Sequence, residues 1–293
     1  NLDLHEELEA ELADFLGKEA VIFYSTGFFS NFGTISTLVA PDDVMVCDRD
    51  NHASIIQGCL LSRAPMKRYL HSDMESLERV LSSIEEGKEK FIITDGVFSM
   101  FGDICNLPEL SRLARKYHAS LIVDDAHSIG VLGENGRGTE EYYGMKDAID
   151  VLTGTFSKSF ACVGGFAASS REVVRFLKAT CPSFIFTASL PPASTATVLA
   201  SLKVLKTDHA RRKRLRMIAD RVRSELNAMG YRTGGSQTPI IPIVIGDRDK
   251  TIAAWEYLFD HGIFCNVSIS PAVPKGSDLL RTSYIATHTD DQI

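Results

Sequence analysis

Short apolar runs alternate with longer segments of helical spacing through the first two thirds of the chain. The apolar runs are VIFYS (21–25), VMVCD (44–48), MKRYL (66–70), FIITD (91–95), SLIVDDA (120–126), IDVLTGT (149–155) and GGFAAS (164–169). Runs of this length are typical of strands in a sheet, and the segments between them are of helical period or length. The alternation predicts an α/β fold, in which helices flank both faces of a mainly parallel sheet.

The pattern changes near residue 200. The basic run HARRKRLR (209–216) belongs to a long predicted helix that ends near Gly230, and we interpret its charges as a solvated face. The apolar positions on the other side of this helix are Leu215, Ile218, Val222 and Leu226. TPIIPIVIG (238–246) then predicts a strand, and AAWEYLFDHG (253–262) a helix. We therefore predict a large domain over residues 1–200 and a smaller α+β domain over residues 201–293.

Both ends of the chain carry helical signals. Leu4, Leu8, Leu12, Phe15 and Leu16 already form an amphipathic pattern, and the closing THTDDQI resembles the start of a helix. We therefore expect the large domain to lack its N-terminal part and the small domain to be truncated.

Composition excludes several classes of protein. The 293 residues are 44% hydrophobic and 24% charged, and the net charge of −7 argues against nucleic acid or an anionic membrane as the main partner. Six scattered cysteines without a CxxC pair favour a reducing compartment and argue against a zinc site. No apolar run is long enough to span a membrane, and no signal peptide opens the chain. We expect a cytoplasmic protein with no metal and no stable membrane insertion.

Polar residues gather directly after the predicted strands. They are Asp95, Asp124, Asp125, His127 and Lys158. In open α/β sheets, ligands bind beyond the carboxyl ends of the strands. The sequence therefore predicts a binding site at this edge of the sheet.

Lys158 lies in GTFSKSFACVGGF, immediately after an apolar strand and among small or hydroxylated residues. An amine in such a pocket becomes nucleophilic when burial or a nearby cation lowers its pKa, and it can then attack a carbonyl. We interpret Lys158 as a Schiff-base lysine for pyridoxal 5'-phosphate (PLP). On this motif alone, an ordinary solvated surface lysine is the stronger alternative.

SLIVDDAHS (120–128) and CDRDNHASI (47–55) supply further candidates at the same edge. A carboxylate at Asp124 would keep a pyridine nitrogen protonated, which makes the ring an electron sink. His127 could meet the same flat ligand, and His52 could stack on its ring. The alternatives are a helix-capping aspartate, a satisfied buried histidine, an ordinary loop histidine, or part of a metal site whose other ligands are not evident.

YSTGFFSNFGTIS (24–36) predicts a helix N-terminus that could bind a phosphate through Thr26, Gly27 and Phe28, although helix capping also explains Thr26. GENGRG (133–138) lacks the spacing of a dinucleotide loop and is interpreted as a turn. The chain has no GxSxG motif, so a serine hydrolase built on Asp124 and His127 would lack its nucleophile.

Together these motifs resemble the α-oxoamine synthases, fold-type I PLP-dependent enzymes that condense an amino acid with an acyl thioester and release carbon dioxide. The resemblance spans nearly the whole chain. It implies that Lys158 attaches the cofactor and later acts as a base. Asp124 would face the pyridinium nitrogen, His127 the ring hydroxyl, and His52 the ring plane and the substrate.

The resemblance also implies further cofactor contacts, from Gly27, Phe28, Ser99, Thr155 and Ser157. Thr187 and Ala188 in IFTASLPP (185–192) would reach the phosphate in a neighbouring subunit, which implies a homodimer with its active site at the interface. Arg281 of the LLR motif would bind the amino-acid carboxylate, a task that suits a bidentate guanidinium.

Within the family, GTFSKS and IFTASLPP are most similar to members that join L-serine to palmitoyl-coenzyme A in the first step of sphingolipid synthesis. TDGVFSM and IIPI are more similar to members that join glycine to an acetyl group. We favour the serine reaction because its motifs lie closer to Lys158. One departure is Ile269, where bacterial members of the serine branch often carry an arginine. Two rival interpretations are a noncatalytic partner subunit, which would normally lack the lysine, and an aminotransferase of the same fold.

Overall fold

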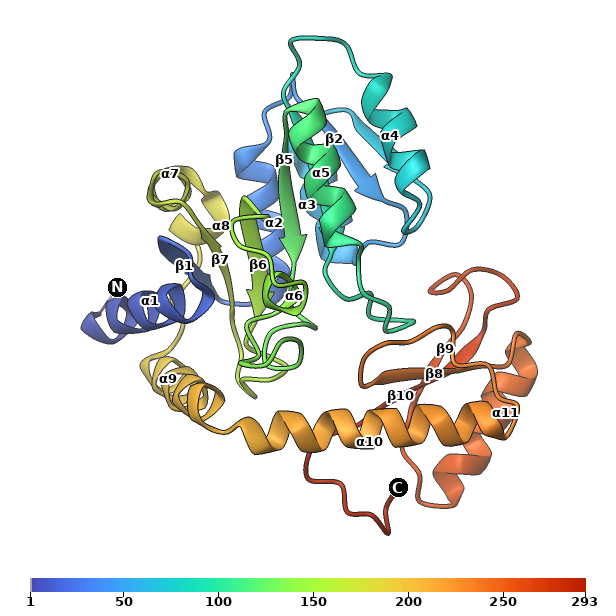
Figure 1. Ribbon diagram of the computed structural model, residues 1–293. Helices are drawn as coiled ribbons and strands as arrows, with labels where there is room; N and C mark the ends of the chain where they lie inside the picture. The colour runs from blue at the N-terminus through green and yellow to red at the C-terminus, as the bar shows by residue number, and fades with distance from the viewer. Residues whose placement is uncertain (1) are drawn as a thin grey trace. The chain divides into compact units, whose positions relative to one another are not determined.

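The computed structural model describes residues 2–293, which divide into two compact units. The first unit holds the residues up to 97 together with 105–207, and the second holds 98–104 together with 208–293. The sequence placed the division after residue 200. Helix α9 (Pro192–Thr207) instead belongs to the first unit, where it packs on α1 (Asp3–Leu16) (Figure 1).

The first unit is built on a seven-stranded sheet. The strand order is β1 (Ala20–Tyr24), β7 (Gly165–Ser169), β6 (Val151–Thr155), β5 (Ala119–Asp124), β4 (Lys90–Asp95), β2 (Val44–Asp48) and β3 (Met66–Tyr69). Neighbouring strands are parallel except at β7, which is antiparallel to both β1 and β6. Residues 156–164 join β6 to β7 without a helix, and a parallel pair needs a longer crossover, so β7 runs in reverse. The prediction of a mainly parallel sheet is confirmed.

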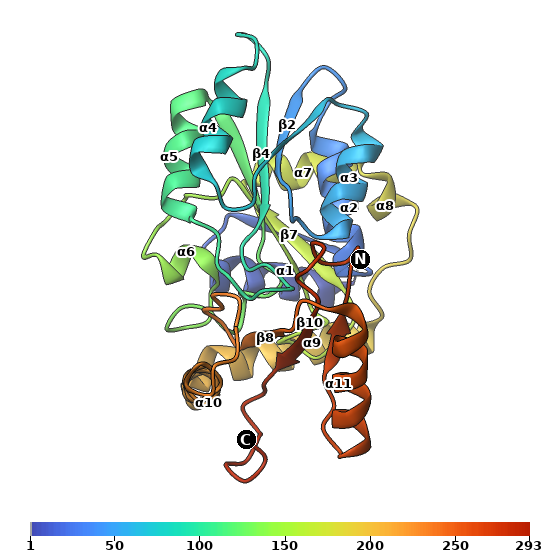
Figure 2. The same cartoon turned by 90° about the vertical axis from the view of Figure 1, so that its right-hand side faces the viewer.

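Helices cover both faces of this sheet, as the sequence predicted (Figure 2). One face carries α4 (Met74–Ser82) and α5 (Leu107–Tyr117), and the other carries α2 (Gly27–Leu38), α3 (Ala53–Ser62) and α7 (Arg171–Thr180). The short helices α6 (Thr139–Tyr142) and α8 (Pro182–Ile185) complete the unit. Because both faces are covered, every residue of β2 and β6 is buried. The core between α2, α3 and the sheet includes Ile35, Met45, Ile55, Ile93 and Ile122.

The second unit has its own small antiparallel sheet. Strand β10 (Leu279–Ser283) lies between β8 (Ile240–Val244) and β9 (Asn266–Ser268), and α10 (His209–Ala228) and α11 (Arg248–Asp260) pack on these strands. The strand and helix expected over 238–262 are thus present as β8 and α11. Ile218 and Val222 are buried, whereas most of the basic side chains of α10 remain in contact with solvent, which confirms the interpretation of a solvated face.

Two details of the sequence reading need correction. The long basic helix begins at His209 rather than near residue 200, because the Asp208 carboxylate accepts the N–H of Arg211 at 3.2 Å as the cap of α10. The closing residues form turns rather than a helix. The Gln292 side chain does accept the N–H of Thr289 at 2.9 Å, a contact typical of a helix start, but no helical turn follows among the last residues.

None of the helices in residues 2–293 combines the length and apolar character that crossing a bilayer requires. Within the same residues, no cluster of three or more histidine, cysteine or acidic side chains could hold a metal ion.

A buried carboxyl group, that of Asp125, hydrogen-bonds the end of the segment that follows β5. Asp125 accepts hydrogen bonds from both the backbone N–H and the hydroxyl of Thr139 at the start of α6. Residues 133–138 form an irregular bend in which Gly133, Gly136 and Gly138 have positive φ, so the segment is a loop, in keeping with the interpretation of GENGRG. Burial raises the pKa of Asp125 from 3.8 to about 6, although the hydrogen bonds from Thr139 act in the opposite direction.

This raised pKa predicts a pH-dependent stability. Ionising Asp125 costs more in the folded chain than in the unfolded chain, so its contribution is complete below about pH 4 and is lost as the pH rises to about 6. The loss should reach at most about 3 kcal/mol. We expect the difference in unfolding free energy between wild type and Asp125→Asn to change across this window, as measured by urea unfolding followed by circular dichroism. A difference that stays constant with pH would contradict the assignment.

Candidate active site

The carboxyl ends of β4, β5 and β6 and the N-termini of α2 and α3 border one cavity of about 340 Å³. This volume lies in the range of small-ligand pockets. Its lining includes eight predicted site residues, namely Gly27, Phe28, His52, Asp124, His127, Thr155, Ser157 and Lys158. Residues more than 130 positions apart in the sequence therefore meet at the sheet edge where the sequence placed them.

Lys158 is held at this cavity by two buried phenylalanines. Phe156 and Phe160 are fully buried on either side of it, and their ring centroids lie 5.2 Å apart. The backbone closes a turn in which the N–H of Ala161 donates to the carbonyl of Lys158 at 3.0 Å. Because the flanking rings are fixed in the core, the lysine between them stays outside the core, where its side chain lines the cavity.

Asp124 is the buried acid of the site. Its side chain accepts the N–H of Ala126 at 2.9 Å through Oδ1 and the Asn31 amide at 2.5 Å through Oδ2. The residue is only 6% exposed, yet it also lines the cavity. A carboxylate fixed by two donors in this way is oriented before any ligand binds.

Asp95, at the end of β4, is a second acid at the cavity. Its Oδ2 accepts the backbone N–H of His52 at 2.7 Å. Burial raises the pKa of Asp95 well above its usual range, and the nearby charge of Asp124 raises it further. Two close carboxyl groups in a buried site do not both ionise easily, so this arrangement favours a neutral Asp95 beside Asp124.

His52 caps α3 and lies at the mouth of the cavity. The residue is exposed, but the surrounding protein still shields its ring from water in part. This shielding lowers the pKa of His52, and the positive charge of Lys158 lowers it too, whereas the charge of Asp124 acts to raise it. The balance favours a neutral imidazole, which is suited to stacking on a ring and to donating one hydrogen bond.

The N-terminus of α2 packs tightly against the strands. Thr26 caps the helix by accepting the N–H of Phe29 at 3.1 Å. A Cβ atom on Gly27 would lie 2.5 Å from Oγ1 of Thr155, and one on Gly165 would lie 2.6 Å from Cα of Gly27. The hydroxyls of Thr155 and Ser157 lie 2.8 Å apart. These hydroxyls and the helix N-terminus border the same cavity, an arrangement that suits a phosphate group.

Ser99 and Arg281 belong to the second unit, where they contact each other. The Nε–H of Arg281 donates to the carbonyl of Ser99 at 2.5 Å. Partial burial lowers the pKa of Arg281. The expected contacts of these two residues with cofactor and substrate remain predictions.

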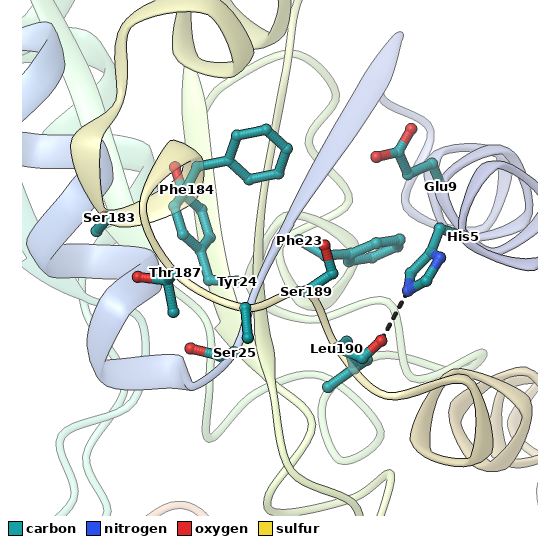
Figure 3. Close-up of a pocket in the computed structure, with 11 residues that line it drawn as sticks. His5, Glu9, Phe23, Tyr24, Ser25, Ser183, Phe184, Thr187, Ser189 and Leu190 are labelled. Atoms are coloured by element: carbon teal, nitrogen blue, oxygen red, sulfur yellow. Dashed lines mark hydrogen bonds between the residues drawn. The ribbon is translucent and has the colours of Figure 1, made fainter. Parts of the chain in front are cut away.

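Thr187 and Ala188 line a second, much smaller cavity (Figure 3). Its volume of about 20 Å³ is enough for one water molecule. The segment that carries them is tied to α1, because Nε2 of His5 bonds the carbonyl of Leu190 at 2.7 Å. Neither residue lines the larger cavity of its own chain, so their expected phosphate contact remains a prediction that requires a second subunit.

Sequence reasoning missed several residues at this site. Asn31, Ser54, Ala126, Val163 and Gly164 were not singled out, and Asp95 was noted only as a residue that follows a strand. Asn31 carried a signal, because it lies four residues after Gly27 and therefore on the same face of α2. Ser54 could have been found through His52, since an N-cap residue contacts the residue two or three positions later.

Comparisons with known proteins agree with this geometry. The family of class I and II aminotransferases matches residues 1–293. Serine palmitoyltransferase of Sphingobacterium spiritivorum is 44% identical over 292 residues, which cover 100% of this chain and 73% of the relative. The 8-amino-7-oxononanoate synthase of Thermoanaerobacter pseudethanolicus is 43% identical over 294 residues, which cover 100% and 74% of the two chains. A solved structure of SPT with a PLP internal aldimine superposes with a TM-score of 0.97 at 39% identity, covering 100% of this chain and 74% of that one.

The chain is an α-oxoamine synthase. It is a PLP-dependent acyltransferase with a fold-type I architecture, as the sequence motifs indicated. The residues at the larger cavity fit this cofactor. They combine an amine, a buried carboxylate, two histidines and a hydroxyl-lined helix N-terminus around one space.

The close packing at Gly27 predicts a loss of cofactor affinity in Gly27→Ala. The added methyl group would overlap Thr155, so either the threonine or the start of α2 must move away from the expected phosphate position. We expect the dissociation constant of PLP to rise about tenfold or more, which corresponds to about 1.4 kcal/mol. Absorbance titration of the cofactor-free protein measures it.

Ser36→Ala provides a matched control on the same helix, because the Ser36 hydroxyl contacts only backbone carbonyls of α2. Its affinity for PLP should stay close to that of wild type. Equal affinities of all three proteins would contradict the proposed phosphate position.

Proposed function

We propose that this enzyme condenses L-serine with palmitoyl-coenzyme A, releasing carbon dioxide and coenzyme A and leaving a 3-keto amine, the first step of sphingolipid synthesis. The observation that carries the reaction class is the meeting of Lys158, Asp124, His127 and His52 at one cavity. Support for the substrates comes from the motifs GTFSKS and IFTASLPP and from relatives named serine palmitoyltransferase at 41–44% identity.

When bound, PLP supplies two things: an aldehyde carbon that reacts with amines, and a protonated ring that withdraws electrons. Lys158 would provide the amine that holds the cofactor, and its free amine would accept the α proton of the amino acid. Asp124 would keep a proton on the ring nitrogen of the cofactor. It is suited to this role because its carboxylate is buried and held by Asn31 and Ala126.

The other residues bind and orient. His127 would bond the ring hydroxyl, and Thr155 and Ser157 would bind the phosphate together with the N-terminus of α2. His52 would cover one face of the ring and orient a substrate oxygen. We assign the amino-acid carboxylate to Arg281, whose guanidinium is already positioned by the carbonyl of Ser99.

The proposal includes a homodimer in the cytoplasm. The dimer is proposed because the family resemblance assigns Thr187 and Ala188 to a neighbouring subunit's phosphate, and neither residue lines the larger cavity of its own chain. Free cysteines at all six positions are consistent with a reducing compartment.

The main alternative is the reaction of an 8-amino-7-oxononanoate synthase, which would place the enzyme in biotin synthesis. Relatives of that name are 41–43% identical to this chain, nearly as similar as the serine palmitoyltransferases. Ile269 also favours this alternative, because members of the serine branch often carry an arginine at that position. Transfer of an acetyl group to glycine is a further alternative within the family, and it rests on TDGVFSM and IIPI. The noncatalytic interpretation is less favoured because Lys158 is present and lines the cavity.

Lys158→Ala should remove both turnover and the visible absorbance of the lysine-linked cofactor, because no amine remains at that point to attach it. Absorbance spectra and coenzyme A release measure the two effects. Lys146→Ala changes an exposed lysine away from the cavity and should retain both. An unchanged spectrum in Lys158→Ala would refute the assignment.

Substrate identity can be measured directly. The holoenzyme is titrated spectrally with L-serine, L-alanine and glycine, and coenzyme A release is then followed with palmitoyl-, pimeloyl- and acetyl-coenzyme A. We expect the highest kcat/KM with L-serine and palmitoyl-coenzyme A. Preference for another pair would replace the substrate assignment but leave the reaction class intact, whereas keto-acid formation without coenzyme A release would indicate an aminotransferase.

Arg281→Lys should raise KM for the amino acid about tenfold, because an ammonium cannot bind a carboxylate with two parallel hydrogen bonds. The absorbance of the bound cofactor should not change. Arg232→Lys, which replaces an exposed arginine of the same unit, serves as the control. A KM equal to that of the control would contradict the role of Arg281.

A further inference from the structure

A chain of buried side chains joins His52 to Asp124. Nδ1 of His52 lies 2.7 Å from Oγ of Ser54, and Nδ2 of Asn31 donates to the same oxygen at 2.9 Å. The same Asn31 nitrogen donates to Oδ2 of Asp124 at 2.5 Å. Asn31 and Ser54 are 2% and 1% exposed, so water does not compete for these bonds. The two residues expected to contact the cofactor ring are therefore linked through the protein.

The direction of each bond follows from the groups involved. A carboxylate can only accept, so the Asn31 atom that faces Asp124 must be its NH₂ group. This orientation leaves Oδ1 of Asn31 to accept the hydroxyl of Thr153, which lies at 2.6 Å. Both hydrogens of the amide are then used, one on Asp124 and one on Ser54.

The hydrogen bonds at Ser54 determine which ring nitrogen of His52 carries the proton. Since Oγ of Ser54 accepts from Asn31, its own hydrogen can be donated to Nδ1 of His52. The backbone N–H of Ser54 also donates to Nδ1, at 3.3 Å, and a backbone N–H can only be a donor. Nδ1 must therefore be an acceptor without a hydrogen. In a neutral ring the proton is then on Nε2.

We propose that Asn31 and Ser54 are positioning residues that hold His52 in the Nε2–H tautomer, so that Nε2 donates to a carboxylate or carbonyl oxygen of the bound substrate. Nε2 has no hydrogen-bond partner within residues 2–293, and His52 lines the cavity. The part of this inference that concerns the substrate rests on the proposed function. The tautomer itself does not.

The charged groups around His52 come from three elements. Asp95 ends β4 and accepts the backbone N–H of His52, Asp124 ends β5, and Lys158 lies beyond β6. Partial burial and the charge of Lys158 lower the pKa of His52 against the opposing charge of Asp124, which is consistent with a neutral ring near pH 7. Removing the Ser54 hydroxyl takes away a donor that favours the neutral form, so it should raise the pKa of His52.

The first test measures the tautomer in the wild-type holoenzyme. Protein labelled with ¹⁵N-histidine is studied by NMR, where protonated and unprotonated ring nitrogens have distinct shifts, and the His52 signals are assigned with His52→Gln. We expect an unprotonated Nδ1 and a protonated Nε2. His5 is an internal reference, because its Nδ1 accepts the N–H of Leu2 at 3.0 Å and its Nε2 bonds a carbonyl. A protonated Nδ1 on His52 would overturn the proposal, whatever the substrate proves to be.

The second test compares three serine variants. In Ser54→Ala we expect a mixture of His52 tautomers, an acid limb of the pH–rate profile shifted to higher pH, and an amino-acid KM raised about fivefold, as expected for one lost hydrogen bond. Ser54→Thr keeps the hydroxyl and should restore all three. Ser62→Ala removes a buried hydroxyl from the same helix without touching His52 and should behave as wild type.

Two results of this comparison would overturn the proposal. One is a Ser54→Ala protein that matches Ser62→Ala in tautomer and pH profile. The other is a Ser54→Thr protein that folds, as shown by circular dichroism and bound-cofactor absorbance, but stays like Ser54→Ala. If Ser54→Ala itself fails to fold, the wild-type NMR measurement still decides the matter.

Discussion

The arrangement of the site depends on one interaction, the hydrogen bonding of the buried Asp124 carboxylate. It is buried at the end of a central strand, and two donors from different elements hold it. A charge in such a place is tolerated only with dedicated partners, so its surroundings cannot vary freely. Asn31 must present its amide there, and this requirement fixes how α2 packs on the sheet.

The same electrostatic constraint shapes the neighbouring groups. Burial and the charge of Asp124 raise the pKa of Asp95, so the second acid at the cavity tends to remain neutral. Its carboxyl group then serves to hold the backbone of His52. Partial burial lowers the pKa of His52 in turn, which favours a neutral ring. The cavity thus combines a buried carboxylate, a neutral histidine and a helix N-terminus, which suits the proposed positions of the cofactor ring and phosphate.

Hydrophobic packing determines the position of Lys158, whereas hydrogen bonds determine that of Asp124. Phe156 and Phe160 lie in the core on both sides of Lys158, and the ring of Phe156 also packs on Phe166 from β7. The reversed direction of β7 is part of this arrangement, because the loop that carries the lysine is the short connection between β6 and β7. Asp125 fastens the adjoining loop through Thr139.

The sequence by itself determined the α/β class, the edge of the sheet where the larger cavity lies, and the lysine, acid and histidines that line it. These could be predicted because hydrophobic period and strand-end position are local properties of the chain. Only the tertiary structure decided that Asn31 and Ser54 connect His52 to Asp124, that β7 is antiparallel, and that α9 belongs with the first unit. Those features depend on contacts between residues far apart in the sequence, and no local pattern records which buried donor will meet which acceptor.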